Sequence, residues 1–170
     1  IGRSAFLGCK GLVSVTLPGT ITEIPESLFS VCISLSEVNL PAQLKRISGN
    51  AFFGCIKLIS IDLPQGLEII GEGAFLLCRG LGSITFPDSL LEIGSSAFWE
   101  CISLTSAKLP DSLRSIGKYA FYRCTSLLNV SLPDGLEIIP EGAFFECTEL
   151  ISVKLPARLK SIEPTAFSSC

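Results

Sequence analysis

The 170-residue chain has no histidine, and only 17% of its residues are charged, against about 25% in an average globular protein. Histidine is the commonest general base and a frequent metal ligand, so a cysteine–histidine nucleophile pair is impossible within this chain. No glycine-rich phosphate loop of the G-x-x-x-x-G-K-[ST] or G-x-G-x-x-G type occurs either. These absences argue against an enzyme, and we expect no cofactor.

Basic residues are scattered, and the net charge is −3. Nucleic-acid binding needs a basic patch or stripe, and binding to an anionic membrane needs a polybasic segment. Although 48% of the residues are hydrophobic, no run approaches the roughly 18 consecutive apolar residues of a membrane span. We therefore expect a large apolar core and some exposed apolar surface, with no nucleic-acid partner and no direct membrane span.

The sequence does contain a 23-residue repeat without insertion or deletion. Three residue types recur at this step: phenylalanine (Phe6, Phe29, Phe52, Phe75, Phe98, Phe121, Phe144, Phe167), cysteine (Cys9, Cys32, Cys55, Cys78, Cys101, Cys124, Cys147, Cys170) and proline (Pro18, Pro41, Pro64, Pro87, Pro110, Pro133, Pro156). Three series with one period indicate a solenoid. We expect residues 1–170 to form a single solenoid of about seven repeats. Because methionine is absent and Ile1 falls within a repeat, we expect an internal fragment of a longer chain.

The repeat reads C-x-x-L-x-x-I/V-x-L-P-x-x-L-x-x-I-x-x-x-A-F-x-x, and residues 104–110 (LTSAKLP) exemplify its first half. Alternating apolar and polar residues before the proline predict a short strand with one buried face. Residues 93–101 (IGSSAFWEC) suggest a short helical or 3₁₀ turn on the opposite side. Stacked repeats cover each other's apolar edges. The predicted fold is a leucine-rich repeat solenoid of the α/β type, mostly β and 3₁₀, shaped as a curved slab with a parallel β-sheet on its concave face.

The pattern resembles the BspA-like leucine-rich repeat family, also called the Treponema pallidum type. The resemblance rests on the L-x-x-I-x-L-P strand, the L-x-x-I-G step and the A-F-x-x-C turn, and it covers the whole chain. Gly71, Gly94 and Gly117 match the family glycine, whereas the family position is occupied by other residues at Pro25, Ser48, Pro140 and Glu163. Family members are mostly adhesion-type or surface-exposed binding proteins. The resemblance thus implies a binding role and a cell-surface or extracellular location.

The eight cysteines allow three interpretations. Zinc ligands usually lie two to four residues apart, which the 23-residue spacing does not match. A disulfide needs Cβ atoms about 3.8 Å apart, closer than stacked coils about 4.8 Å apart place them. We favour a ladder of buried free thiols, which would indicate a reducing, intracellular compartment. Asp88, Asp111 and Asp134 form a column that could bind Ca²⁺, but aspartate after proline also suits a turn, so we expect no metal site.

The position after each core phenylalanine is the leading candidate for partner binding. It carries large apolar residues in five successive repeats: Phe53, Leu76, Trp99, Tyr122 and Phe145. Ile56 and Ile102, three residues after this position, are expected beside them. If exposed, these residues form an apolar stripe with Trp and Tyr, the favoured interface anchors. If half-buried under the next turn, they serve as additional core.

The polar strand positions offer a second candidate surface. On the predicted concave face they form columns that include Ser83, Thr85, Ser106, Lys108, Asn129 and Ser131. Such a face could hydrogen-bond a glycan or a peptide, or it could simply be solvated. A further apolar column, Val13, Ile59, Leu128 and Ile151, is interrupted by polar or small residues.

The sequence therefore favours a protein-interaction or scaffolding module with a protein partner, such as a structural subunit of a larger assembly. The alternative is a cell-surface adhesin that binds a glycan or a host protein through the concave face.

Overall fold

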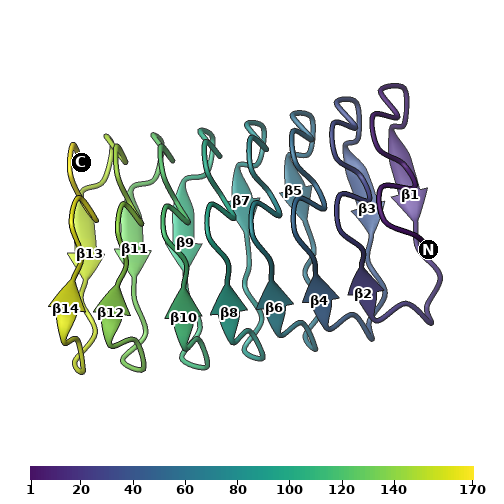
Figure 1. Ribbon diagram of the computed structural model, residues 1–170. Helices are drawn as coiled ribbons and strands as arrows, with labels where there is room; N and C mark the ends of the chain where they lie inside the picture. Colours follow the sequence, from purple (N-terminus) through teal and green to yellow (C-terminus); the bar gives the residue numbers. More distant parts are fainter.

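The computed structural model describes all residues, 1–170, as coils stacked side by side, with the two termini at opposite ends of the stack (Figure 1). Each coil contributes two short strands. The first strands are β1 (Ser14–Thr16), β3 (Glu37–Asn39), β5 (Ser60–Ile61), β7 (Ser83–Ile84), β9 (Ser106–Lys108), β11 (Asn129–Ser131) and β13 (Ser152–Lys154). The second strands are β2 (Glu23–Ile24), β4 (Arg46–Ile47), β6 (Ile69–Ile70), β8 (Glu92–Ile93), β10 (Ser115–Ile116), β12 (Ile138–Ile139) and β14 (Ser161–Ile162). The leucine-rich repeat solenoid predicted from the sequence is confirmed.

All strand pairs are parallel and join neighbouring coils. The first strands pair as β1–β3, β5–β7 and β9–β11–β13, and the second strands as β2–β4–β6–β8–β10 and β12–β14. The register is 23 residues throughout: Val130 lies opposite Val153 on one side and Ala107 on the other. Each repeat position therefore lies beside its own equivalents, and every side chain belongs to a column along the stack.

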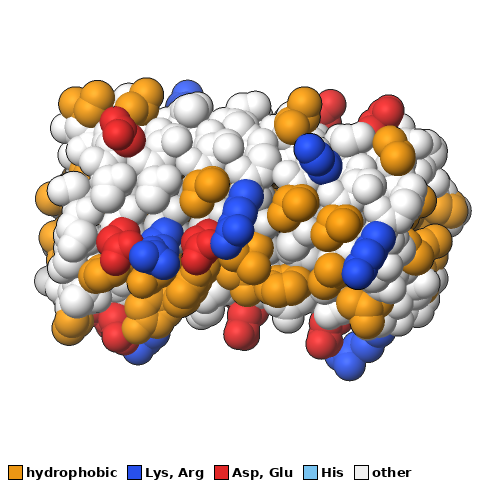
Figure 2. Space-filling view, turned by 90° about the horizontal axis from the view of Figure 1, so that it is seen from above, with side chains coloured by type: hydrophobic (Ala, Val, Ile, Leu, Met, Phe, Trp, Pro, Cys, Tyr) orange, Lys and Arg blue, Asp and Glu red, His pale blue; other side chains and the backbone are white.

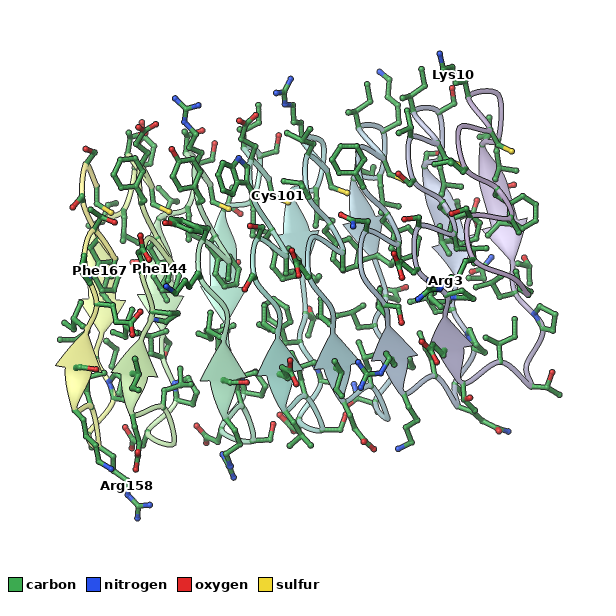
Figure 3. The ribbon with its side chains drawn as sticks, in the orientation of Figure 1. Arg3, Lys10, Cys101, Phe144, Arg158 and Phe167 are labelled. Carbon is green, nitrogen blue, oxygen red and sulfur yellow. The ribbon has the colours of Figure 1, made fainter.

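The core is built around the phenylalanine column. Neighbouring rings stack with centroids 5.1–5.5 Å apart and planes inclined by 3–20°. The six inner rings, Phe29 to Phe144, are fully buried, whereas Phe6 and Phe167, in the first and last coils of the described residues, are only partly buried. Figure 3 labels Phe144 and Phe167 in the last two coils. Burial of an aromatic ring on both faces requires two flanking coils, so stability depends on stacking.

The turn that carries the phenylalanine differs from the prediction. We expected a short helical or 3₁₀ turn there, but the segment contains successive turns and no helix. Each coil has two residues with positive φ, four positions apart, such as Ser96 (φ 55°) and Glu100 (φ 54°). A left-handed residue breaks the run of right-handed dihedrals that a 3₁₀ helix requires, which explains why the helix does not form.

Hydrogen bonds between coils hold this turn in place. The amide of Phe98 donates to the carbonyl of Ala120 in the next coil at 2.7 Å, and the amide of Glu100 donates to Tyr122 O at 2.8 Å. Within the coil, the amide of Cys101 donates to Phe98 O at 3.1 Å. The backbone groups of the turn are thus satisfied by the neighbouring coil as well as by the coil itself.

All eight cysteines are free thiols, as the spacing predicts. From Cys32 to Cys170, each sulfur donates to the carbonyl of the phenylalanine in the preceding coil, at 3.0–3.3 Å. Burial raises the pKa of Cys55 and Cys147 to about 12, and that of Cys101 well above its usual range. The thiols therefore serve as small buried donors that link coils.

Replacing an inner core ring should destabilise the stack more than replacing a terminal one. Phe98→Ala removes a ring stacked on both faces and should lower the free energy of unfolding by about 3–5 kcal/mol. In the isolated chain of residues 1–170, Phe167→Ala should lower it clearly less, because Phe167 there stacks only on Phe144. Urea denaturation of both variants measures the difference, and equal losses would contradict the stacking argument.

Alkylation should separate the exposed thiols from the buried ones. Native protein treated with iodoacetamide at pH 9 should be modified only at the two exposed thiols, rapidly at Cys9 and more slowly at Cys170, because partial burial raises the pKa of Cys170. Cys55 stays protonated at that pH because its folded-state pKa of about 12 lies above it, and the thiolate is the reactive form. The pKa of Cys55 is lower in the unfolded chain, near 9.0, than in the folded protein. Its thiol therefore stabilises the folded protein below pH 9, and this contribution is lost as the pH rises towards 12. Peptide mass mapping measures the modification, with urea-unfolded protein as the control in which all eight react.

Candidate functional site

The aromatic row, Phe53, Leu76, Trp99, Tyr122 and Phe145, runs along one edge of the stack. All five side chains are half-buried. Figure 2, which looks onto the edge at the top of Figure 1, shows hydrophobic side chains gathered into a band along the lower border of the view. The row thus combines features of both interpretations: each side chain packs against neighbouring coils and still presents part of its surface to solvent.

The three rings at the C-terminal end of the row stack in sequence. The Trp99 and Tyr122 centroids lie 4.1 Å apart at 28°, and those of Tyr122 and Phe145 lie 5.1 Å apart at 7°. Because the rings stack face to face along the solenoid axis, they present their edges outward. From Trp99 to Phe145 the surface is therefore an apolar ridge of ring edges.

Tyr119 belongs to the same cluster, although sequence analysis missed it. Its ring lies 5.8 Å from Trp99 and 6.0 Å from Tyr122, both measured between centroids. Its backbone is left-handed (φ 59°), an uncommon conformation for a bulky residue. The equivalent position in the other coils is Ser, Asn, Gly or Thr, so an aromatic residue in a column of small ones was the available signal.

The next coil accommodates Tyr119 through Gly142 and Glu141. A Cβ atom at Gly142 would lie 2.3 Å from Cδ1 of Tyr119, so only glycine leaves room for the ring. The phenol hydroxyl donates to Oε1 of Glu141 at 2.6 Å, and Nζ of Lys118 donates to Oε2 at 2.9 Å. These hydrogen bonds lower the pKa of Glu141, and the bond to Glu141 raises the pKa of Tyr119. Glu141 thus stays ionised and fixes the position of the phenol ring.

A charged row, Arg79, Glu100, Arg123 and Glu146, runs beside the aromatic row. Arg79 and Glu100 approach to 2.6 Å, Arg123 and Glu100 to 3.8 Å, and Arg123 and Glu146 to 2.6 Å. The hydrogen bond to Glu146 raises the pKa of Arg123, whose guanidinium carbon also lies 5.9 Å from the centroid of Tyr122. Figure 2 shows basic and acidic side chains alternating beside the hydrophobic band.

The two isoleucines expected beside the row are exposed, Ile56 by 41% and Ile102 by 38%. Ile102 lines a shallow hollow together with Glu100, Arg123, Thr125 and Glu146. The interrupted apolar column is more exposed, with Ile59 at 65% and Ile151 at 78%. Ser36, Gly82 and Thr105 interrupt this column, so only Leu128 and Ile151 are neighbours and no continuous surface runs along the stack.

The six polar candidates lie on or beside the first strands. Ser131 is half-buried, and the other five are exposed: Ser83, Thr85, Ser106, Lys108 and Asn129. Thr85, Ser106 and Lys108 line a hollow with Asp88. The hydroxyl of Ser152 donates to Oδ1 of Asn129 at 2.6 Å, so part of this face is occupied by its own hydrogen bonds.

The aspartate column lies in the turns after the first strands, and all three residues are exposed. Oδ1 of Asp134 accepts a hydrogen bond from the backbone amide of Ala157 in the next coil at 3.0 Å. The carboxylate therefore closes a turn. No group of three or more acidic, cysteine or histidine side chains lies close enough together to hold a metal ion.

Adding a methyl group at Gly142 should disrupt the Tyr119 position. Gly142→Ala introduces both a left-handed alanine and a clash with the ring, so it should lower the free energy of unfolding by about 2–4 kcal/mol and change the fluorescence of Trp99. Gly54→Ala is the matched control: Gly54 also has positive φ (69°), but its Cβ would meet nothing nearer than 3.9 Å. Similar losses and spectra in the two variants would show that Gly142 is not needed for the ring.

The structure is similar to those of several bacterial leucine-rich repeat proteins. That of T. pallidum is 31% identical, with a TM-score of 0.61 over 96% of this chain and 63% of its own. A leucine-rich cell surface protein of Faecalibacterium prausnitzii is 29% identical, with a TM-score of 0.61 over 98% of this chain and 54% of its own. A leucine-rich repeat protein of Eubacterium ventriosum, 23% identical over 92% and 42%, shares the fold with a TM-score of 0.82. This chain spans less than two thirds of each relative.

No curated protein matches the sequence. No helix long and apolar enough to cross a membrane is present. The sequence profile of the BspA type leucine-rich repeat region matches residues 1–101 and 45–170, in six copies, and so spans the entire chain. Together with the T. pallidum relative, this match confirms the predicted resemblance. The chain belongs to the BspA-type leucine-rich repeat family.

Proposed function

We propose that residues 1–170 act as a protein-interaction module, a structural part of a larger assembly, that docks through the aromatic row. The observation that carries the proposal is the half-exposed contact of Trp99 with Tyr122 and Tyr119 on the edge of the stack. Trp and Tyr are enriched among residues that dominate binding energy, because they combine a large apolar surface with a polar group.

The fold does not require large residues in this row. Ser30 and Ser168 occupy the same position in other coils, where the phenylalanine column is nevertheless intact. Large apolar side chains in five successive coils are therefore not explained by coil stacking. Contiguous apolar surface of this kind is typical of interaction sites.

The burial and ion pairing of the titratable groups favour binding over catalysis. The inner thiols are buried with raised pKa values, which makes them poor nucleophiles. The carboxylates beside the row are engaged with Arg79, Arg123 and Lys118. We propose that the chain is not an enzyme.

The second candidate is a cell-surface adhesin that holds a glycan or a host protein on the polar face of the first strands. Two observations favour it: the F. prausnitzii relative is described as a cell surface protein, and Thr85, Ser106 and Lys108 line a hollow on that face. A surface location is part of this candidate, whereas free thiols are more typical of a reducing compartment.

Site-specific photo-crosslinking distinguishes the two surfaces. A photoreactive phenylalanine analogue at Tyr122, in the full-length protein in its own cells, should yield one predominant crosslinked product. The same residue at Ser106, on the polar face, should yield none, because that position is exposed but lies on the other surface. Crosslinks from Ser106 alone would refute the proposal and favour the adhesin.

Tyr122→Asp should weaken binding of the crosslinked partner by at least about 30-fold, the loss expected for an interface residue worth about 2 kcal/mol. The fold should be retained, since Tyr122 is only half-buried and its column tolerates serine elsewhere. Surface plasmon resonance measures the affinity, circular dichroism verifies the fold, and Ile59→Asp, also exposed, is the matched control. Unchanged affinity, or unfolding of the variant alone, would contradict the proposal.

A further inference from the structure

We propose that the aromatic row docks onto the same row of a second copy of this chain, in antiparallel orientation, about a two-fold axis between the coils of Glu100 and Arg123. This inference rests on the proposed function, because it names the partner of the same surface. A two-fold dimer uses one patch twice, so the patch must be complementary to itself when its direction is reversed. The charged row and the aromatic row can each be tested for that property.

The central pair of the charged row is self-complementary. Glu100, Arg123 and Glu146 share one repeat position, whereas Arg79 belongs to the position of Ile102, two residues later. Reversal about the proposed axis places Arg123 opposite Glu100 of the second copy, and Glu146 opposite Leu77 of the second copy. Displacement of the axis by half a coil would instead place Arg123 opposite Arg123 of the second copy. The alternation therefore selects the axis between the coils, because like charges in contact oppose association.

The aromatic row is complementary in size under the same operation. Trp99 meets Tyr122 of the second copy, Leu76 meets Phe145 of the second copy, and Phe53 meets Ser168 of the second copy. The largest pair thus lies at the axis, and the ring at one end of the row faces a small residue. Charge and side-chain volume point to one register, although they depend on different residues.

The spacing of the row also favours a second stack of coils over an unrelated partner. Core rings recur every 5.1–5.5 Å along the molecule, and the row follows the same coils. Another coil stack has the same repeat, so contacts stay in register over five coils. A helix rises about 5.4 Å per turn but does not carry a side chain at the same azimuth in each turn, and its contacts would drift.

Water is excluded from the centre of such an interface, so each charge there needs partners. Glu100 already lies between Arg79 and Arg123 within its chain, at 2.6 and 3.8 Å. Nε of Arg123 is held by Glu146 at 2.6 Å, whereas Nη1 lies 3.8 Å from Glu100, so Nη1 is the group that can also meet Glu100 of the second copy. The hollow lined by Glu100, Ile102 and Arg123 lies beside the proposed axis, where a side chain of the second copy can enter it.

Sedimentation velocity of the purified chain and two charge-reversed variants tests the proposal. The unmodified chain should sediment as a dimer in the micromolar range. Glu100→Arg and Arg123→Glu should each dimerise at least tenfold more weakly, because each places like charges opposite each other at both symmetry-related contacts. An equimolar mixture of the two variants should form a heterodimer, since each contact then joins opposite charges. If a substitution prevented dimerisation by disturbing its own chain, mixing the two variants would not restore the dimer.

Glu68→Arg is the matched control, since it reverses a comparable pair with Lys45 (2.7 Å) beside the second strands and should leave sedimentation unchanged. A monomeric unmodified chain, single variants that dimerise normally, or a mixture that stays monomeric would each overturn the dimer. Crosslinking from Tyr122 to a different protein would also overturn it while leaving the proposed function intact. Absence of any crosslink from Tyr122 would count against both.

Discussion

The contact on which the whole molecule depends is the one between neighbouring coils at the phenylalanine turn. There a buried ring stacks on its equivalent, the amide of the phenylalanine donates to the next coil, and its carbonyl accepts a hydrogen bond from the cysteine thiol of the next coil. All three interactions need a neighbour at a spacing of about 5 Å. A single repeat can make none of them, so the strands, which are only two or three residues long, persist because the turns hold the coils in register.

Sequence analysis could identify the core because its residues recur. Phe98, Cys101 and Leu104 are identical in neighbouring repeats, and a residue repeated at a fixed step must occupy equivalent space in a solenoid. The turn conformation could not be predicted in the same way. Its left-handed positions are filled by serine, asparagine, glutamate, arginine and even tyrosine, residues that adopt positive φ here because coil-to-coil hydrogen bonds impose it.

The candidate surface is predictable in part for a related reason. The five members of the aromatic row stand out because they vary in a column that the core leaves free, and sequence analysis named them all. The exposure of such a column depends on how far each side chain extends over the next coil. In the structure all five side chains are half-buried. Tyr119 and its glycine neighbour, Gly142, act as a pair from different coils, a relation visible only once the 23-residue register places them together.

The 23-residue register has a consequence for molecular recognition. Because most buried positions are occupied by nearly the same residue in every coil, the interior distinguishes one coil from another at only a few positions, such as Phe86 and Ala107. On the surface, individual coils are distinguished by side chains that the packing does not specify, such as Trp99, Tyr119 and Arg123. A molecule that binds these side chains recognises particular coils of a nearly uniform stack. Exchanging a few surface residues between coils would therefore move the binding site along the stack without altering the core.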